Sequence, residues 1–144
     1  MSESLRHLEG VIALERFVRA RAERRADLVV YRDAPDSGPQ TKPPLVGGFR
    51  PDLFARTWKD GAFVIGEAKT AQDLETAHSL AQLEAFVAAV SEAPMGVFVL
   101  SVPLAAAASA RGLLQALAAG TPGLDERLHC ISPGIDDILP SGAC

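Results

Sequence analysis

The sequence predicts an α/β protein, a sandwich of helices around a mixed β-sheet with its elements in the order αβββαβαβ. Apolar residues recur at helical spacing over residues 4–25. Two short apolar runs then flank Asp60 and Gly61, a residue pair typical of a tight hairpin turn. A helical pattern separates the second run from the apolar segment 95–102, which is typical of a strand covered on both faces. The third and fourth strands should therefore be joined by a right-handed parallel crossover.

The first half contains one helix and three strands. The helix over residues 4–25 is followed by Asp27 and by a first strand over 28–31. A proline-rich loop covers 33–48. The second strand covers 49–56, and Pro51 makes its start edge-like or bulged because proline has no amide hydrogen to donate. The third strand covers 62–69.

The second half alternates helices with strands. Asp73 is predicted to cap a helix that runs to about Ser91, and Pro94 follows its end. The fourth strand covers 95–102, an Ala-rich helix covers 104–119 before Gly120, and a short fifth strand covers 128–132. The tail from residue 133 carries no predicted element. We therefore expect a single domain over residues 1–144, with its core at about 5–132.

Composition excludes several classes of protein. No stretch approaches the roughly 20 apolar residues of a membrane helix, so we expect no membrane partner. The N-terminal residues include acidic side chains and no apolar run, which argues against a signal peptide. Cys130 and Cys144 lack metal-ligand spacing, and we interpret them as a packed thiol and a tail thiol in a reducing cytoplasm. We therefore expect a cytoplasmic protein.

Charge is distributed unevenly along the chain. The net charge of −4 argues against a general nucleic-acid coat. Residues 1–69 nevertheless hold twelve of the fourteen Lys and Arg and have a net charge of +2, whereas residues 70–144 have −6. The basic half fits a one-sided footprint for phosphate, and a solvated Arg-rich helix face is the alternative. The candidates for nucleic-acid contacts are Arg16, Arg19, Arg24, Arg25 and Arg50.

Three charged residues are predicted to meet at the ends of the second and third strands. With a two-residue turn at Asp60 and Gly61, Asp52 lies opposite Lys69 and diagonally next to Glu67, roughly 7–8 Å away at Cα. All three then share one face of the sheet, because side chains alternate along a strand. A one-residue shift in register would separate them.

This cluster is interpreted as a site for a divalent metal and a phosphodiester. Two carboxylates at that distance can share one hard cation of Mg²⁺ size, with water in the other positions. The alternative is a surface ion-pair cluster, which contributes roughly 0–1 kcal/mol per pair. Apolar residues flank Asp52, Glu67 and Lys69, and charges that enter a buried sheet are costly unless paired or metal-bound. This cost favours the metal site over the surface ion-pair cluster.

The motif Pro51-Asp52 with Glu67-Ala68-Lys69, in this order of elements, resembles the PD-(D/E)xK nuclease superfamily. That superfamily includes restriction endonucleases, archaeal Holliday-junction resolvases and VRR-type nucleases, and the resemblance covers roughly residues 5–102. It implies a restriction endonuclease-like three-layer sandwich. It also implies Mg²⁺ or Mn²⁺ bound by Asp52, Glu67 and the carbonyl of Ala68. Lys69 would orient or activate the attacking water.

The resemblance extends to a carboxylate on the first helix, which also serves as a metal ligand. Glu15 matches its place before the first strand and falls near Leu8, Ile12 and Val18, on the predicted inward side. Glu9 is the competing candidate. A solvent-exposed role for both is the third possibility.

Some branches of the superfamily also carry a Gln followed four residues later by an aromatic residue. Gln82 and Phe86 match this pattern, and such a Gln positions the metal-bound water or a phosphate. The alternative is a surface Gln beside a core Phe. Thr70 and His78 lie within reach of the substrate in this arrangement, although a lone His is more often structural.

The resemblance implies a Mg²⁺-dependent nuclease that hydrolyses phosphodiester bonds in DNA, as in DNA repair or recombination. We expect it to be endonucleolytic and to select structure more than sequence, because the chain has no obvious recognition helix or second domain. A homodimer is a further expectation. The alternatives are a catalytically silent nuclease-fold module that binds nucleic acid or a protein partner, and a structural α/β protein with a surface charge cluster.

Overall fold

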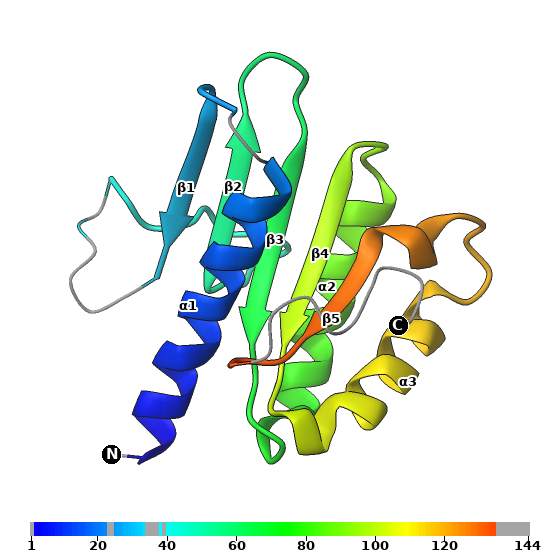
Figure 1. The fold of residues 1–144 in the computed structure, drawn as a ribbon. Coiled ribbons are helices and arrows are strands. Elements are labelled where there is room, and N and C mark those ends of the chain that lie inside the picture. The colour runs from blue at the N-terminus through cyan, green and yellow to red at the C-terminus, as the bar shows by residue number, and fades with distance from the viewer. Residues whose placement is uncertain (1, 23–24, 34–37, 39, 135–144) are drawn as a thin grey trace.

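The computed structural model describes residues 2–22, 25–33, 38 and 40–134 (Figure 1). The elements follow the predicted order. The helices are α1 (Ser2–Ala22), α2 (Ala77–Ser91) and α3 (Ala107–Ala118). The strands are β1 (Leu28–Arg32), β2 (Leu53–Thr57), β3 (Phe63–Ala68), β4 (Gly96–Ser101) and β5 (Leu128–Ile131).

The five strands form one mixed sheet in the order β1-β2-β3-β4-β5. β1, β2 and β3 pair antiparallel, whereas β3, β4 and β5 pair parallel, so the predicted parallel crossover through α2 is confirmed. Figure 1 shows α1 crossing one face of the sheet, with α2 and α3 on the other. The result is an α/β protein whose layers are compatible with a three-layer sandwich.

Each face of the sheet has its own core. On one face, α1 buries Val11, Leu14 and Val18 against residues such as Leu53 and Val99. The opposite core joins α2 and α3 to the sheet. Its largest fully buried members are Phe86, Phe98, Leu83, Leu100, Leu114, Leu124, Leu128 and Ile65. Packing on both faces explains why β4 is apolar up to Ser101 at its end.

The predicted inward side of α1 was wrong for Leu8 and Ile12 and correct for Val18. Leu8 and Ile12 are exposed at 42% and 45%, whereas the buried stripe runs through Val11, Leu14 and Val18. The reason is a close approach at Gly10, where an added Cβ would lie 2.8 Å from the Cβ of Ala68. This contact between α1 and β3 determines which side of the helix faces the sheet.

The predicted register of β2 and β3 was also wrong, by two residues. Leu53 pairs with Gly66, and the Thr57 amide donates to the Ala62 carbonyl at 3.0 Å. Residues 58–61 therefore form a four-residue connection, not a two-residue turn. An even shift leaves every side chain on its predicted face. It places Asp52 opposite Glu67 instead of Lys69.

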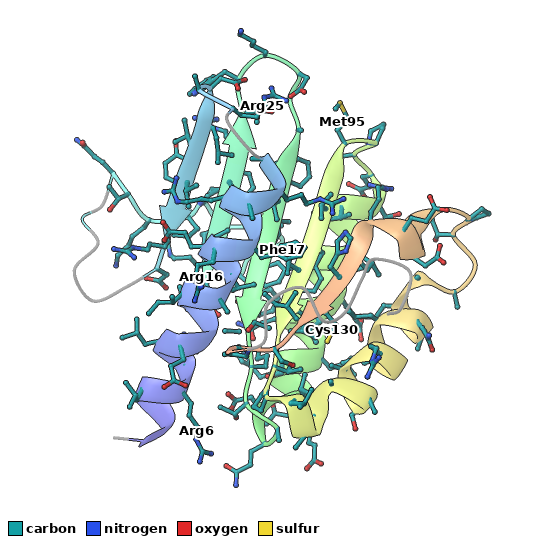
Figure 2. The ribbon with its side chains drawn as sticks, viewed as in Figure 1. Arg6, Arg16, Phe17, Arg25, Met95 and Cys130 are labelled. Atoms are coloured by element: carbon teal, nitrogen blue, oxygen red, sulfur yellow. The ribbon has the colours of Figure 1, made fainter. Side chains whose placement is uncertain are left out.

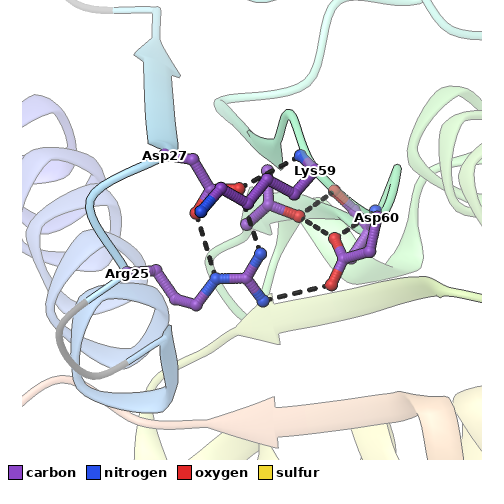
Figure 3. Close-up of polar contacts among 6 residues, drawn as sticks. Arg25, Asp27, Lys59 and Asp60 are labelled. Carbon is purple, nitrogen blue, oxygen red and sulfur yellow. Dashed lines mark hydrogen bonds and ion pairs between the residues drawn. The ribbon is translucent and has the colours of Figure 1, made fainter.

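Polar contacts to Asp60 explain the longer connection (Figure 3). The Asp60 carboxylate accepts hydrogen bonds from the Thr57 hydroxyl and from the Ala62 amide, the latter at 3.3 Å. Arg25 donates to Asp60 at 3.1 Å and to Asp27 at 3.0 Å. Asp27 in turn accepts from the Lys59 amide at 3.1 Å. These contacts join the loop to the segment before β1. The local sequence of the turn does not reveal them.

Several element boundaries also differ from prediction, and those of α2 and β2 lie closest to the charged cluster. Asp73 does not cap α2; it begins a short 3₁₀ helix, Asp73–Glu75, and exchanges hydrogen bonds with Thr70. The cap is Thr76, whose side chain accepts from the Ser79 amide at 3.1 Å. β2 begins at Leu53 and not at residue 49, because Phe49 pairs with Val46 in an isolated bridge.

In the part of the chain that the structure describes, no helix has the length and apolar character needed to cross a bilayer. Cys130 is buried in β5, between the sheet and the helices (Figure 2). Cys144 and most of the predicted irregular tail lie outside the described residues.

We expect His129 in β5 to make the protein sensitive to acid. Its side chain is 1% exposed, and burial, with a smaller effect of the Arg21 charge, lowers the pKa of His129 to about 4. The unfolded chain binds a proton near pH 6.5, so the free energy of unfolding falls as the pH drops from there towards 4. This group alone should remove about 3 kcal/mol between pH 7 and pH 4.

The measurement is denaturant unfolding of wild type and of His129→Leu at pH 7, 5.5 and 4. His129→Leu should lose less stability than wild type over this range. Equal losses in both proteins would show that His129 is not the responsible group.

Candidate active site

Asp52 and Glu67 are held together where β2 begins and β3 ends. The Asp52 amide donates to Glu67 Oε1 at 3.1 Å, and the Ala68 amide donates to Asp52 Oδ2 at 2.8 Å. Each carboxylate therefore bonds to the main chain of the strand that carries the other. This reciprocal arrangement follows from the observed register, which places the two residues opposite one another.

Lys69 and Gln82 complete the cluster. Lys69 Nζ lies 3.1 Å from Glu67 Oε2 and donates a hydrogen bond to Gln82 Oε1. The side chains of Glu67 and Lys69 are only 4% and 11% exposed. Gln82 thus faces the cluster from α2, while Phe86, one turn later, is fully buried in the core. The structure brings Asp52, Glu67, Lys69 and Gln82 together.

His7 of α1 is a member of the cluster that the sequence did not single out. His7 Nε2 lies 3.2 Å from Asp52 Oδ1. The hydrogen bond to Asp52 raises the pKa of His7 above its ordinary value. The available signal was its spacing, since His7 continues the buried stripe of Val11, Leu14 and Val18 by one turn. The prediction that Leu8 and Ile12 face the sheet conceals this signal, because it turns His7 away from the sheet.

The two helix glutamates lie in different surroundings. Glu15 accepts from Arg19 at 2.9 Å and lies 3.4 Å from Arg32, so the structure pairs it with arginines instead of bringing it to the two carboxylates. Glu9 lines a cavity whose wall also includes Lys69. Its position favours Glu9 over Glu15 as the helix carboxylate nearer the cluster.

Burial and charge give Glu67 an unusual proton affinity. Burial, followed by the negative charge of Asp52, raises the pKa of Glu67 well above that of an ordinary carboxyl, and Lys69 opposes this only in part. Burial therefore disfavours the charged form of Glu67 more than Lys69 favours it. A cation bound between the carboxylates would stabilise that charged form.

The donor set fits Mg²⁺ or Mn²⁺. Among the described residues, no three His, Cys, Asp or Glu side chains gather to hold a metal. Mg²⁺, however, is commonly held by one or two carboxylates and keeps several waters. Asp52 and Glu67 supply that pair. The backbone of Ala68 lies beside them, because its amide donates a hydrogen bond to Asp52.

The predicted arginines do not collect around this cluster. Arg19 is tied to Glu15, Arg25 to Asp27 and Asp60, and Arg50 to the Pro43 carbonyl. Arg25 lies near the far end of α1 from Arg6, and Arg16 lies between them on the exposed side (Figure 2). Arg24 lies outside the described residues. Carboxylates compensate the charges of Arg19 and Arg25, which weakens both as phosphate contacts.

Thr70 and His78 have contacts that stabilise the fold near the cluster. The Thr70 hydroxyl accepts from the Asp73 amide at 3.2 Å, at the start of the short 3₁₀ helix. The His78 ring packs edge-on against Phe49, with ring centroids 5.7 Å apart. Both residues flank the site, and Thr70 also lines the cavity beside Lys69.

We expect Gly10→Ala to disturb the site through the backbone. A Cβ at Gly10 would meet Ala68 at 2.8 Å, so α1 must move away from β3 and carry His7 with it. Overpacking of this kind typically costs about 1–3 kcal/mol. The matched control is Gly112→Ala in α3, where a Cβ meets nothing within 4 Å. This change should raise the free energy of unfolding by about 0.5–1 kcal/mol, because Ala is the better helix former.

Denaturant unfolding of the three proteins measures both effects. A Gly10→Ala protein as stable as Gly112→Ala would show that α1 adapts without strain. The close approach would then have no part in the shape of the site.

Comparison of the chain with protein-family models, with curated proteins and with solved structures gives no match. The cluster is therefore interpreted from its own geometry. That geometry consists of two opposed carboxylates, one ammonium, one amide side chain and one imidazole, supplied by α1, α2, the start of β2 and the end of β3.

Proposed function

We propose that this protein is a divalent-metal-dependent nuclease with a PD-(D/E)xK-type site and a restriction endonuclease-like fold. Its substrate is DNA, which it cuts internally and selects by structure more than by sequence. The observation that carries the proposal is the buried Glu67, set between Asp52 and Lys69 at the carboxyl end of β3. A surface ion-pair cluster does not account for it, because Glu67 is 4% exposed and its pKa is raised.

Asp52 and Glu67 would hold Mg²⁺ or Mn²⁺, with the Ala68 carbonyl as a proposed backbone ligand. When bound, such an ion polarises a phosphoryl oxygen and lowers the pKa of a bound water. His7 and the Ala68 amide orient the Asp52 carboxylate by engaging one oxygen each. The Asp52 amide does the same for Glu67.

Lys69 provides a fixed positive charge. Its ammonium is held by Glu67 and by Gln82, so its position does not depend on a flexible side chain finding the substrate. A charge oriented in advance stabilises the negative charge that develops on the phosphoryl oxygens during hydrolysis. Gln82 acts here by positioning Lys69.

The test is a cleavage panel with Mn²⁺ over single-stranded, duplex, flapped and branched DNA and over RNA. The matched control is Glu67→Gln, which keeps the shape of the protonated side chain and should fold, since burial already favours the neutral form. We expect wild type to cut at least one DNA, and no cutting by Glu67→Gln or after chelation. If wild type cuts nothing on the panel, the catalytically silent module becomes the better account.

A further inference from the structure

A cavity of about 260 Å³ lies beside Lys69, at the carboxyl ends of β3 and β4. Its walls include Arg6, His7 and Gly10 of α1 on one side and Ala68 and Ser101 at the strand ends on the other. In open α/β sheets, ligands bind outside the carboxyl ends of the parallel strands. The cavity shares His7 and Lys69 with the candidate active site and extends away from it along α1.

Ser101 gives this cavity an unused hydrogen-bonding group. Its side chain is 1% exposed, and among the described residues its Oγ has no hydrogen-bond partner. The Oγ lies 3.6 Å from the position that a Cβ on Gly10 would take, so it points toward α1 and the cavity. A buried hydroxyl without a partner costs stability. A ligand that accepts its hydrogen bond explains why it is there.

The charges around the cavity favour an anion that carries a hydrogen-bond donor. Arg6 is exposed near the N-terminal end of α1 (Figure 2) and contributes positive charge, and Lys69 lines the same cavity beside its partner Glu67. Glu9 contributes a carboxylate to the same wall. A phosphate group matches the cations and the hydroxyl, and a ring N–H or sugar hydroxyl matches Glu9.

The remaining wall is apolar. Pro103 and Leu104 line it, and Leu104 is 56% exposed. The charged residues Arg6 and Glu9 line the same cavity. An apolar surface beside an anion site suits a sugar and a base attached to a phosphate.

We propose that this cavity is a subsite for a single nucleotide of the substrate, next to the bond that is cut. Its phosphate lies against Arg6 and Ser101, and its sugar and base lie over Pro103 and Leu104. The assignment of the ligand to nucleic acid rests on the proposed function. The subsite itself can be measured without cleavage.

The test is calorimetric titration of the full chain, in chelator at fixed ionic strength, with thymidine 5′-monophosphate, thymidine and inorganic phosphate. We expect the monophosphate to bind more tightly than either fragment. Ser101→Ala and Arg6→Gln should each weaken it about tenfold or more, as expected for losing a hydrogen bond to a charged group. Lys59→Gln, which removes a positive charge in the β2–β3 connection, is the matched control and should leave the affinity unchanged.

Ser101→Ala also has a signature in the absence of ligand. Because it deletes an unpartnered buried hydroxyl, it should raise the midpoint of thermal unfolding while it weakens the monophosphate. Loss of binding therefore cannot be attributed to loss of fold.

Three outcomes would overturn the subsite: no binding of the monophosphate to wild type, equal affinity in all four proteins, or inorganic phosphate bound as tightly as the nucleotide. Cleavage by the same proteins tests the proposed function separately. Monophosphate binding that depends on Ser101 and Arg6, in a protein that cuts nothing, would keep the subsite and reject the nuclease. DNA cleavage by wild type, with the same monophosphate affinity in wild type, Ser101→Ala and Arg6→Gln, would keep the nuclease and reject the subsite.

Discussion

Replacing Lys69 by Met is expected to slow DNA cleavage by about 10²–10³-fold or more, the usual cost of losing one charge stabiliser at a transition state. Met keeps most of the length of the side chain and removes the ammonium that lies 3.1 Å from Glu67. Substrate affinity should fall far less, because the ground-state phosphate makes less use of a single charge than the transition state does. The measurement is single-turnover cleavage at saturating Mg²⁺, beside a substrate-binding curve in Ca²⁺.

The matched control is Lys59→Met, in the loop between β2 and β3, which should cut at the wild-type rate. The metal site should survive in Lys69→Met, because Asp52 and Glu67 remain and their contacts to backbone amides do not involve Lys69. A Lys69→Met protein that cuts as fast as wild type would reduce Lys69 to a counter-ion for Glu67. The silent module would then be preferred.

Removing either carboxylate is expected to weaken Mn²⁺ binding strongly. Asp52→Asn and Glu67→Gln each delete one of the two charges that the strands bring together. We expect losses on the order of 10–100-fold or greater, since even outer-shell changes at metal sites reach that range. Calorimetric titration of Mn²⁺ measures the effect, with Glu84→Gln, an exposed carboxylate on α2, as the control.

The pH dependence of Mn²⁺ affinity and of stability distinguishes the two variants. Protonated Glu67 cannot bind a metal, so wild-type affinity should rise as the pH increases through its raised pKa, and Glu67→Gln should not show this rise. Asp52→Asn removes a charge that raises this pKa, so its transition should move to lower pH. Without metal, the contribution of Glu67 to stability is full below its unfolded-state pKa and is lost as the pH rises through the folded-state value.

Equal Mn²⁺ affinity in wild type and in both variants would exclude the carboxylate pair as the metal site. A loss confined to Asp52→Asn would indicate that Glu67 stays protonated and serves only as a partner of Lys69.

The sequence by itself determined the order of the elements and the grouping of the three motif residues. Helical and strand periodicities are local properties, so α1 through β5 could be recognised without knowledge of their partners. Asp52, Glu67 and Lys69 shared a predicted face because side chains alternate along a strand. The true register differed by two residues, and an even shift does not change which face a side chain occupies.

Only the tertiary structure decided the partners within the site. The register depends on Asp60, whose contact with Arg25 joins residues 35 positions apart. The inward side of α1 depends on the close approach of Gly10 to Ala68, and with it the contact of His7 with Asp52. These contacts join segments that are distant in the chain. The spacing of Val11, Leu14 and Val18 fits the observed inward side of α1, but Leu8 and Ile12 offered a competing side, and only the packing against β3 decides between them. The pairing of Glu15 with Arg32 has the same cause, since α1 must be placed against β1 before Arg32 can reach Glu15.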